Sequence, residues 1–241
     1  MPCVASAWNP EDFRCHEEAS RNAPEDARLL LGFGVHPQLP AHGGPDTTIS
    51  LETMEQLASE HRLDAVGETG FDLYDAWFRE SEPEQDRIFA RHIEIAHEHG
   101  LPLVIHVRRA LHKIFAASAY LKKLPAVIFH SWPGTPGDGD SLLKRGINAF
   151  FSFGNALVCN HKQAIRSAAL LPLHRILLET DAPYQPRRDC SYSYWTDLPV
   201  LGELLVQLRR ENTDFSGSAD DMTTIIDSNF FRAFTGTNHT G

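Results

Sequence analysis

The sequence predicts an α/β protein with a TIM-type (β/α) barrel that lacks its first strand. Short apolar runs with strand character alternate with amphipathic stretches of helical length, the pattern that a parallel sheet with crossover helices produces. Polar residues with metal-binding chemistry follow several of these runs directly, as residues do at the carboxyl ends of barrel strands. Seven runs are present along the chain, whereas a closed barrel of this type needs eight.

The strand and helix candidates follow one another regularly along the chain. We expect strands at Cys3–Ala7, Leu30–Val35, Ala65–Gly67, Leu103–Val107, Ala126–Phe129, Ala149–Phe153 and Ile176–Leu178. We expect helices at residues 10–22, 48–61, 83–99, 109–122, 138–145, 160–170, 195–211 and 219–235. Start signals support several of these helices, for example Ser50 with the acidic Glu52 behind it and Pro83 in the first turn before Glu84. Since the first strand candidate starts almost at Met1, we expect the absent strand to be the one before it.

Length and composition are consistent with a single domain over residues 1–241, because 42% of the 241 residues are hydrophobic. No apolar run approaches the roughly 20 residues that span a bilayer, and the start of the chain lacks the basic flank of a signal peptide. We therefore expect a cytoplasmic location and no membrane partner. The four cysteines show no C-x-x-C spacing, which favours reduced thiols.

A formal net charge of −10 argues against non-specific binding of nucleic acid. An anionic substrate must therefore meet local positive charge or bound metal. Arg109, Lys113, Arg187 and Arg188 are candidates for such local charge, with a solvated surface position as the alternative and the preferred interpretation for Lys113.

Five polar residues end or follow successive strand candidates: His36, Glu68, His106, His130 and Asp181. A single histidine at such a place often does no more than bond the next loop, but five in series converge on one point of a parallel barrel. Imidazole and carboxylate together suit zinc, manganese or other divalent ions, and an open ligand position leaves room for an activated water. Hydrolysis is the chemistry that this combination favours.

Five short motifs resemble, in order and spacing, those of the TatD family of metal-dependent deoxyribonucleases. They are G-V-H-P at 34–37, G-E-T-G-F-D at 67–72, P-L-V-I-H-V-R-R-A at 102–110, H-S-W-P-G at 130–134 and E-T-D-A-P-Y at 179–184. The resemblance continues to Asn229 and Phe234, which match a late N-x-x-x-x-F element of the family.

The resemblance implies one or two divalent ions, Mg, Mn or Zn, held by Glu68, His106, His130 and Asp181. In the family pattern Glu68 bridges two metals, the two histidines complete one site, and Asp181 binds at the other and orients or activates the attacking water. Taken alone, Asp181 could instead cap a turn before Ala-Pro.

The resemblance also implies that His36 and Arg108 bind the substrate phosphate. Strand alternation would place Glu179 on the same side as Asp181, so we count Glu179 among the catalytic candidates, either behind a metal ligand or in contact with substrate. A surface charge is the alternative for Glu179. Trp132 is either a stacking platform for a base or, more conservatively, part of the core.

The family's first strand carries a His-x-His pair that this sequence does not contain, and His16, inside a predicted helix, does not replace it. We expect either an N-terminally incomplete chain or a divergent member with fewer metal ligands. The leading functional hypothesis is a deoxyribonuclease that cleaves phosphodiester bonds in DNA or in a small phosphodiester substrate. The alternatives are a related metallohydrolase that cleaves amides or other esters, and an inactive truncated relic or binding module. The sequence leaves the oligomeric state open.

Overall fold

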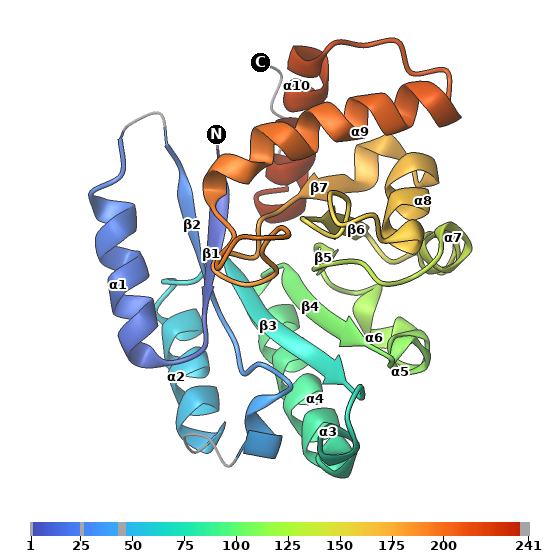
Figure 1. Ribbon diagram of the computed structural model, residues 1–241. Helices are drawn as coiled ribbons and strands as arrows, with labels where there is room; N and C mark the ends of the chain where they lie inside the picture. The colour runs from blue at the N-terminus through green and yellow to red at the C-terminus, as the bar shows by residue number, and fades with distance from the viewer. Residues whose placement is uncertain (1, 25–26, 43–46, 237–241) are drawn as a thin grey trace.

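In the computed structural model, seven parallel strands form one curled sheet that is surrounded by helices (Figure 1). The structure describes residues 2–24, 27–42 and 47–236. The strands follow each other in the sheet in the order of the chain, from β1 to β7. Among the described residues β1 and β7 each pair with a single neighbour, so the sheet is a half-barrel that does not close.

The bounds of the elements match the expected strand and helix pattern closely. The strands are β1 (Cys3–Ala7), β2 (Leu29–Phe33), β3 (Ala65–Asp72), β4 (Leu103–Arg108), β5 (Val127–Phe129), β6 (Ala149–Phe153) and β7 (Ile176–Leu178). The helices are α1 (Pro10–Arg21), α2 (Thr47–Ser59), α3 (Ala76–Glu80), α4 (Glu82–His99), α5 (Leu111–Ala116), α6 (Ser118–Leu121), α7 (Pro136–Lys144), α8 (Lys162–Leu170), α9 (Leu198–Asn212) and α10 (Ala219–Phe234). The described residues also contain the 3-10 turns η1 (Leu39–His42), η2 (Leu173–Arg175) and η3 (Trp195–Asp197).

Three expectations about these elements were wrong in detail. The strand predicted to end at Gly67 continues to Asp72, past a register shift that hides its period. The helix predicted over 109–122 is two short helices, α5 and α6, and Arg109 before them has a positive φ of 55° that no α-helix contains. Ser50 is buried inside α2 rather than at its start, whereas Pro83 does lie in the first turn of α4.

Side chains alternate between two sides of the curled sheet, as the geometry of a strand requires. One set packs outward against the helices and includes Phe33, Ile105 and Phe129. The other set points to the interior of the half-barrel and forms a separate apolar cluster. Its members are Val4, Leu30, Ala65, Val104, Ala126, Ile128, Phe150, Leu177 and, from α10, Phe230, Ala233 and Phe234.

The last helix therefore contributes to the interior of the half-barrel. Asn229 of α10 is buried, and its side-chain amide donates to the carbonyl oxygens of Leu173 at 2.9 Å and Ile176 at 2.7 Å. These bonds fix α10 at the amino end of β7, so that Phe234 can fill the interior cluster. This contact gives a structural reason for the Asn229 and Phe234 pattern in the sequence.

Within the described part of the chain, no helix combines the length and the apolar character that a membrane span requires.

The carboxyl end of β2 is held by a buried histidine of α4. His92 is fully buried; its Nε2 accepts a hydrogen bond from the Val35 N–H at 2.9 Å, and its Nδ1 lies 2.8 Å from the Ile88 carbonyl oxygen. This pairing satisfies both ring nitrogens of a neutral imidazole. Burial lowers the pKa of His92 from its usual 6.5 to about 4, against a small opposing effect of the Ile88 carbonyl.

His92 should make the protein sensitive to acid. The neutral imidazole is kept in the folded chain while the unfolded chain takes up a proton, so the free energy of unfolding falls as the pH drops from 6.5 towards 4. We expect His92 alone to contribute a loss of about 2 kcal/mol at mildly acidic pH. Urea unfolding at pH 7 and pH 4.5 should show this loss in the parent and a clearly smaller one in His92→Gln. The exposed His97→Gln on the same helix is the control, and equal pH profiles for parent and His92→Gln would contradict the prediction.

Candidate metal centre

The candidate site lies where the strands end, on the side of the sheet that forms the interior cluster. His106 follows the interior residue Val104 by two positions, and His130 follows Ile128 by two. Because strand side chains alternate with a period of two, both histidines point to the interior. The sequence order of an apolar interior residue and then a polar one therefore produces a polar layer above the apolar cluster.

Glu68 reaches the same layer because β3 contains an irregularity. Val66 is paired with Leu103 and Thr69 with Ile105, so β3 holds one more residue than β4 in this stretch. Such a bulge reverses the side to which the following side chains point. Ala65 points to the interior before the bulge, and Glu68 does so after it.

Gly34 allows β2 to come close to this irregular stretch of β3. A Cβ atom at Gly34 would lie 2.5 Å from the Gly67 carbonyl carbon and 2.7 Å from the Glu68 carbonyl oxygen. Only glycine tolerates backbones this close. His36 follows Gly34 by two positions and lies beside Glu68, with Nε2 at 3.6 Å from Glu68 Oε1.

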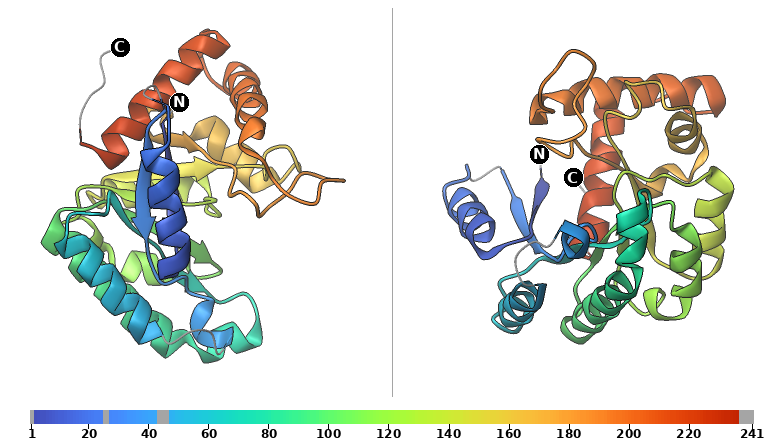
Figure 2. Two further views of the ribbon diagram at one scale, coloured as in Figure 1. Left: turned by 90° about the vertical axis from the view of Figure 1, so that its left-hand side faces the viewer. Right: turned by 60° about the horizontal axis from the view of Figure 1, so that its bottom comes forward.

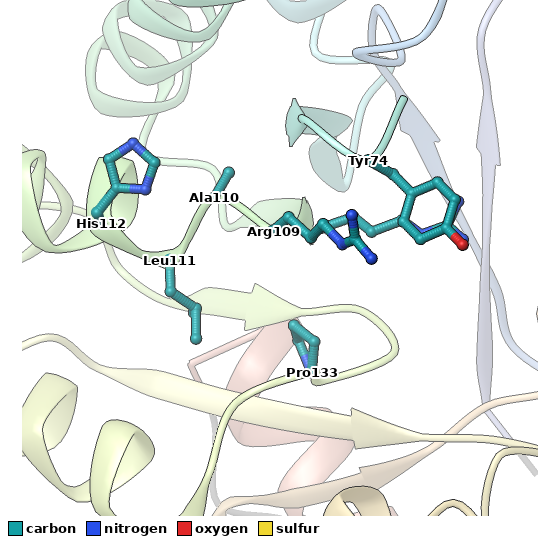
Figure 3. Close-up of a pocket in the computed structure, with 7 residues that line it drawn as sticks. Tyr74, Arg109, Ala110, Leu111, His112 and Pro133 are labelled. Carbon is teal, nitrogen blue, oxygen red and sulfur yellow. The ribbon is translucent and has the colours of Figure 1, made fainter. Parts of the chain in front are cut away.

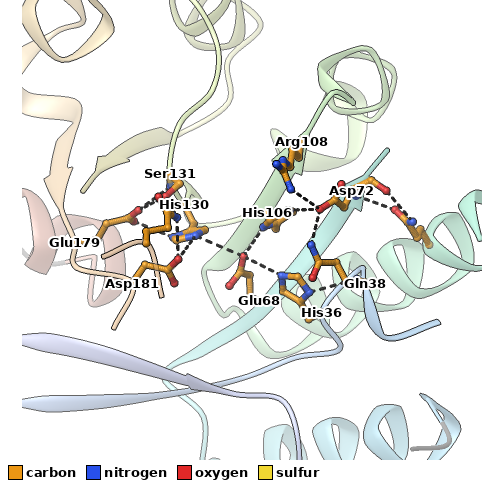
Figure 4. Close-up of polar contacts among 12 residues, drawn as sticks. His36, Gln38, Glu68, Asp72, His106, Arg108, His130, Ser131, Glu179 and Asp181 are labelled. Atoms are coloured by element: carbon orange, nitrogen blue, oxygen red, sulfur yellow. Dashed lines mark hydrogen bonds and ion pairs between the residues drawn. The ribbon is translucent and has the colours of Figure 1, made fainter. Parts of the chain in front are cut away.

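One oxygen of Glu68 is the centre of the site (Figure 4). Glu68 Oε1 lies 2.9 Å from His106 Nδ1, 3.6 Å from His36 Nε2 and 3.8 Å from His130 Nε2. His36, Glu68 and His106 offer ligand atoms that all lie within 4.8 Å of one another. Asp181 joins from the other side, with Oδ2 at 3.6 Å from His130 Nε2.

The other ring nitrogen of each histidine also faces a protein group, although His106 Nε2 has no hydrogen-bond partner among the described residues. His130 Nδ1 lies 3.0 Å from Glu179 Oε2, and His106 Nε2 lies 3.4 Å from Asp72 Oδ2. His36 Nδ1 accepts a long hydrogen bond of 3.3 Å from the Gln38 N–H. These outer contacts fix the orientation of the rings, as they do in many metal sites.

The sequence assigned no role to Asp72, although it lies in one of the five motifs. Its side chain is fully buried, accepts hydrogen bonds from the Gln38 side-chain amide at 2.7 Å and the Tyr74 N–H at 2.9 Å, and lies behind His106. Asp72 follows Glu68 by four positions on β3, so both point to one side. Because we expected the strand to end at Gly67, the common side of Glu68 and Asp72 could not be predicted.

Glu179 lies behind His130 rather than at the open side of the site. Its Oε1 accepts hydrogen bonds from the Ser131 N–H at 2.9 Å and the Ser131 hydroxyl at 2.6 Å, while Oε2 faces His130. Both carboxylate oxygens therefore have protein partners.

Arg108 lies at the mouth of the site. Its guanidinium Nη1 is 3.9 Å from Asp72 Oδ2, and 47% of its side chain is exposed. The arrangement leaves the cation free to meet an anion that enters from solvent.

Three residues around the site adopt a backbone conformation that is unfavourable outside glycine. Ser131, Asp181 and Gln185 have φ angles of 43°, 53° and 50°. Such positions cost on the order of 1 kcal/mol or more each and gather at functional sites. The Gln185 side-chain amide connects two of them, since it donates to Asp181 Oδ2 at 2.8 Å and Ser131 Oγ at 2.7 Å.

The electrostatics reflect carboxylates and imidazoles crowded into a mostly buried space. Burial raises the pKa of Glu68, but His130, His106 and His36 more than offset it, so that the pKa lies well below its usual range. Burial alone would lower the pKa of His130, but the neighbouring carboxylates of Glu179 and Glu68 raise this pKa well above its usual value. The pKa of Asp72 falls to about 2, since burial is outweighed by His106 and Gln38.

Asp181 differs from the other carboxylates of the site. Its pKa is raised, first by burial, and the nearby Glu179 and Glu68 add to the effect of burial against the opposing charge of His130. Four carboxylates, Glu68, Asp72, Glu179 and Asp181, share the site with three imidazoles. A site with this excess of acidic groups attracts cations.

Lys113 and Trp132 take no part in this cluster. Lys113 forms ion pairs with Glu82 at 2.9 Å and Asp86 at 2.7 Å, away from the mouth. Trp132 is buried and packs edge-on against Phe129 and Phe151, which confirms the core interpretation.

Arg187 belongs to the segment between β7 and α9. Its guanidinium lies 2.9 Å from the buried carboxylate of Asp197, which also accepts a hydrogen bond from Asn155. The charge of Arg187 is therefore paired with Asp197, where it stabilises this segment, and is not available to bind an anion at the site.

Comparison with known proteins gives the same result as the motifs. Residues 2–235 match the family described as TatD related DNase. A relative from Musicola paradisiaca (strain Ech703), named 3'-5' ssDNA/RNA exonuclease TatD, is 32% identical over 181 residues, or 71% of this chain and 66% of the relative. A relative of the same name from Pantoea vagans (strain C9-1) is 30% identical over 226 residues, or 87% of this chain and 81% of the relative.

The matched part spans less than two thirds of the first relatives, namely 66% of the one from Musicola paradisiaca and 58% of the one from Dickeya dadantii (strain 3937). Two solved structures share the fold. The TatD homolog YJJV from Escherichia coli k12 has a TM-score of 0.81 at 22% identity and covers 96% of this chain and 85% of its own. A hydrolase of the TatD family from Entamoeba histolytica has a TM-score of 0.73 at 14% identity, covering 98% and 85%. Since the family match extends over residues 2–235, the chain belongs to the TatD related DNase family.

Proposed function

We propose that the chain hydrolyses phosphodiester bonds of single-stranded nucleic acid, with a divalent ion held by Glu68, His106 and His130. The observation that carries the proposal is the approach of His106 Nδ1 and His130 Nε2 to Glu68 Oε1, at 2.9 and 3.8 Å, with His36 Nε2 beside them at 3.6 Å. Carboxylate and imidazole donors fit Mg, Mn or Zn.

The contacts of the ring nitrogens support different roles for the three histidines. His130 donates its Nδ1 proton to Glu179, which leaves the Nε2 lone pair for a metal. His106 Nδ1 lies 2.9 Å from Glu68 Oε1, so Nδ1 is the atom that would bind an ion beside Glu68, while Nε2 on the other side of the ring lies 3.4 Å from Asp72 Oδ2. His36 Nδ1 instead accepts from the Gln38 N–H, so its Nε2 carries the proton and acts as a donor.

From these differences we infer separate roles for the residues of the site. Bound beside Glu68, a divalent ion would lower the pKa of a water and offset charge on the phosphate. Asp181, 3.6 Å from His130, would orient that water and accept its proton. His36 and Arg108 donate hydrogen bonds to the phosphate oxygens from the mouth. Glu179 acts through His130, whose ring it holds, rather than on substrate.

The exposed aromatic residues of the segment between β7 and α9 favour a single-stranded nucleic acid as the substrate. Figure 2 shows this segment projecting from the body of the protein. Four of its aromatic side chains are 53% to 73% exposed: Tyr184, Tyr192, Tyr194 and Trp195. Exposed rings next to a catalytic site stack on unpaired bases. The relatives from Musicola paradisiaca and Pantoea vagans carry the name 3'-5' ssDNA/RNA exonuclease, which is the activity we infer here.

Hydrolysis of a labelled single-stranded oligonucleotide with Mg²⁺, Mn²⁺ or Zn²⁺ tests the proposal directly. Glu68→Gln removes the central negative charge and should lower turnover roughly 100-fold or more, because loss of metal removes several kcal/mol of transition-state stabilisation. The exposed Glu98→Gln on α4 should match the parent. Absence of turnover by the parent with all three ions, or cleavage of an amide substrate in place of DNA, would refute the proposed activity.

Metal titration by calorimetry should separate His106 from His36. His106→Ala should weaken Mn²⁺ binding by at least about 10-fold, because even residues behind the ligands contribute that much. His36→Ala should retain the affinity for Mn²⁺ and raise the KM for the oligonucleotide. The exposed His97→Ala serves as the control. Equal loss of Mn²⁺ affinity in both variants would make His36 a ligand instead.

Glu179→Gln distinguishes support of His130 from direct catalysis. The amide cannot hold the Nδ1 proton of His130 as a carboxylate does, so Mn²⁺ affinity should fall about 10-fold to 100-fold. At saturating Mn²⁺ most of the turnover should return. A fall in kcat at saturating metal, with affinity for Mn²⁺ unchanged, would instead favour Glu179 as a catalytic residue.

A further inference from the structure

A cavity of about 550 Å³ has Arg108, which also contacts Asp72 of the candidate site, in its lining; Figure 3 shows the residues around it. It is lined by Tyr74, Arg108, Arg109, Ala110, Leu111, His112 and Pro133. These residues come from the segments that follow β3, β4 and β5. The cavity therefore opens on the face that carries the candidate site, beyond the ring of histidines.

Two guanidinium groups pack against one aromatic ring in this cavity. The central carbon of the Arg108 guanidinium lies 3.7 Å from the centroid of Tyr74, and that of Arg109 lies 4.3 Å from it. Contact with the π-face of a tyrosine restrains a guanidinium while leaving its N–H donors available. Tyr74 therefore holds two cations of like charge close together.

The backbone under these side chains is fixed. The Tyr74 N–H donates to Asp72 Oδ1 at 2.9 Å, and Arg79 donates to the Tyr74 carbonyl oxygen at 2.9 Å. Arg109 has a φ of 55°, a conformation that arginine adopts only where the surrounding structure imposes it. The position of Arg109 is thus set by the fold and not by chance at a flexible surface.

The positive charge at this place is not balanced by the protein. Arg108 has its carboxylate contact at 3.9 Å, with Asp72, which is already engaged with His106. Among the described residues, no carboxylate lies within 4.0 Å of the Arg109 guanidinium. The chain as a whole has a formal net charge of −10. In such a protein, the unpaired guanidinium of Arg109 beside that of Arg108, which shares Asp72 with His106, favours an anionic ligand.

We propose that this cavity binds the phosphate next to the scissile one in a single-stranded oligonucleotide, with Arg109 as its donor and Tyr74 holding Arg109 in place. The proposal rests on the function proposed above. Arg108 stands between the two positions, since it contacts Asp72 of the metal centre and Tyr74 of the cavity. A strand whose reacting phosphate lies at the histidines then passes its next phosphate over Arg109. The substrate class is an oligonucleotide rather than a mononucleotide ester.

Binding of fluorescein-labelled (dT)8 in EDTA tests the cavity without any cleavage, so the result does not depend on whether the chain is a nuclease. Arg109→Gln should weaken binding about tenfold, as loss of one charge-assisted phosphate contact does. The slope of log affinity against log salt should become shallower by about 0.7, the value for one phosphate of a single strand. The matched control is Arg145→Gln, since Arg145 is exposed and also packs on a ring, that of Phe115 at 5.2 Å. Arg145→Gln should leave affinity and slope as in the parent.

A neutral linkage in the oligonucleotide identifies the phosphate. In (dT)4 with one methylphosphonate at each linkage in turn, the loss caused by Arg109→Gln should disappear at one position. Tyr74→Phe should keep the affinity of the parent and Tyr74→Leu should lower it, because the ring and not the hydroxyl holds the guanidinium. Equal affinities and equal salt slopes for Arg109→Gln and Arg145→Gln would overturn the proposal. So would a loss in Arg109→Gln that is the same for every methylphosphonate position.

Discussion

The carboxylate of Glu68 is the constraint around which the rest of the site is arranged. A carboxylate placed inside a half-barrel is unfavourable unless charged or polar groups surround it. Here His36, His106 and His130 approach one of its oxygens, and further carboxylates stand behind two of those rings. The site therefore has the carboxylate of Glu68 at its centre, three imidazoles around it, and the carboxylates of Asp72 and Glu179 behind two of those imidazoles. Each layer fixes the orientation of the one before.

Much of this arrangement can be predicted from the sequence because it follows from strand geometry. A histidine two positions after a buried apolar residue, as in Val104 and His106, faces the same side as that residue. Repeated on neighbouring parallel strands, this relation predicts convergence without any knowledge of side-chain contacts. The parallel half-barrel of seven strands follows from the same alternation of apolar runs and helices.

The parts that could not be predicted depend on irregular backbone or on distant contacts. The bulge between Val66 and Thr69 interrupts the period of two, so neither the length of β3 nor the role of Asp72 is visible from pattern alone. The support of Val35 by His92 joins positions 57 residues apart. Arg109 has a positive φ, which is incompatible with the continuous helix expected over 109–122. The surrounding structure imposes this conformation, and no residue type at this position indicates it.

The contribution of α10 to the interior cluster has a consequence for the order in which the molecule forms. Phe230 and Phe234 belong to the same cluster as Val4 and Leu30, so this interior joins regions separated by about the whole described length of the chain. Contacts between residues so far apart in the sequence form late, because a long loop must close, at a cost in chain entropy, before these contacts stabilise the protein. Until α10 docks, the apolar faces of the early strands stay open to water and to other chains, and the half-barrel is most exposed to aggregation during that interval.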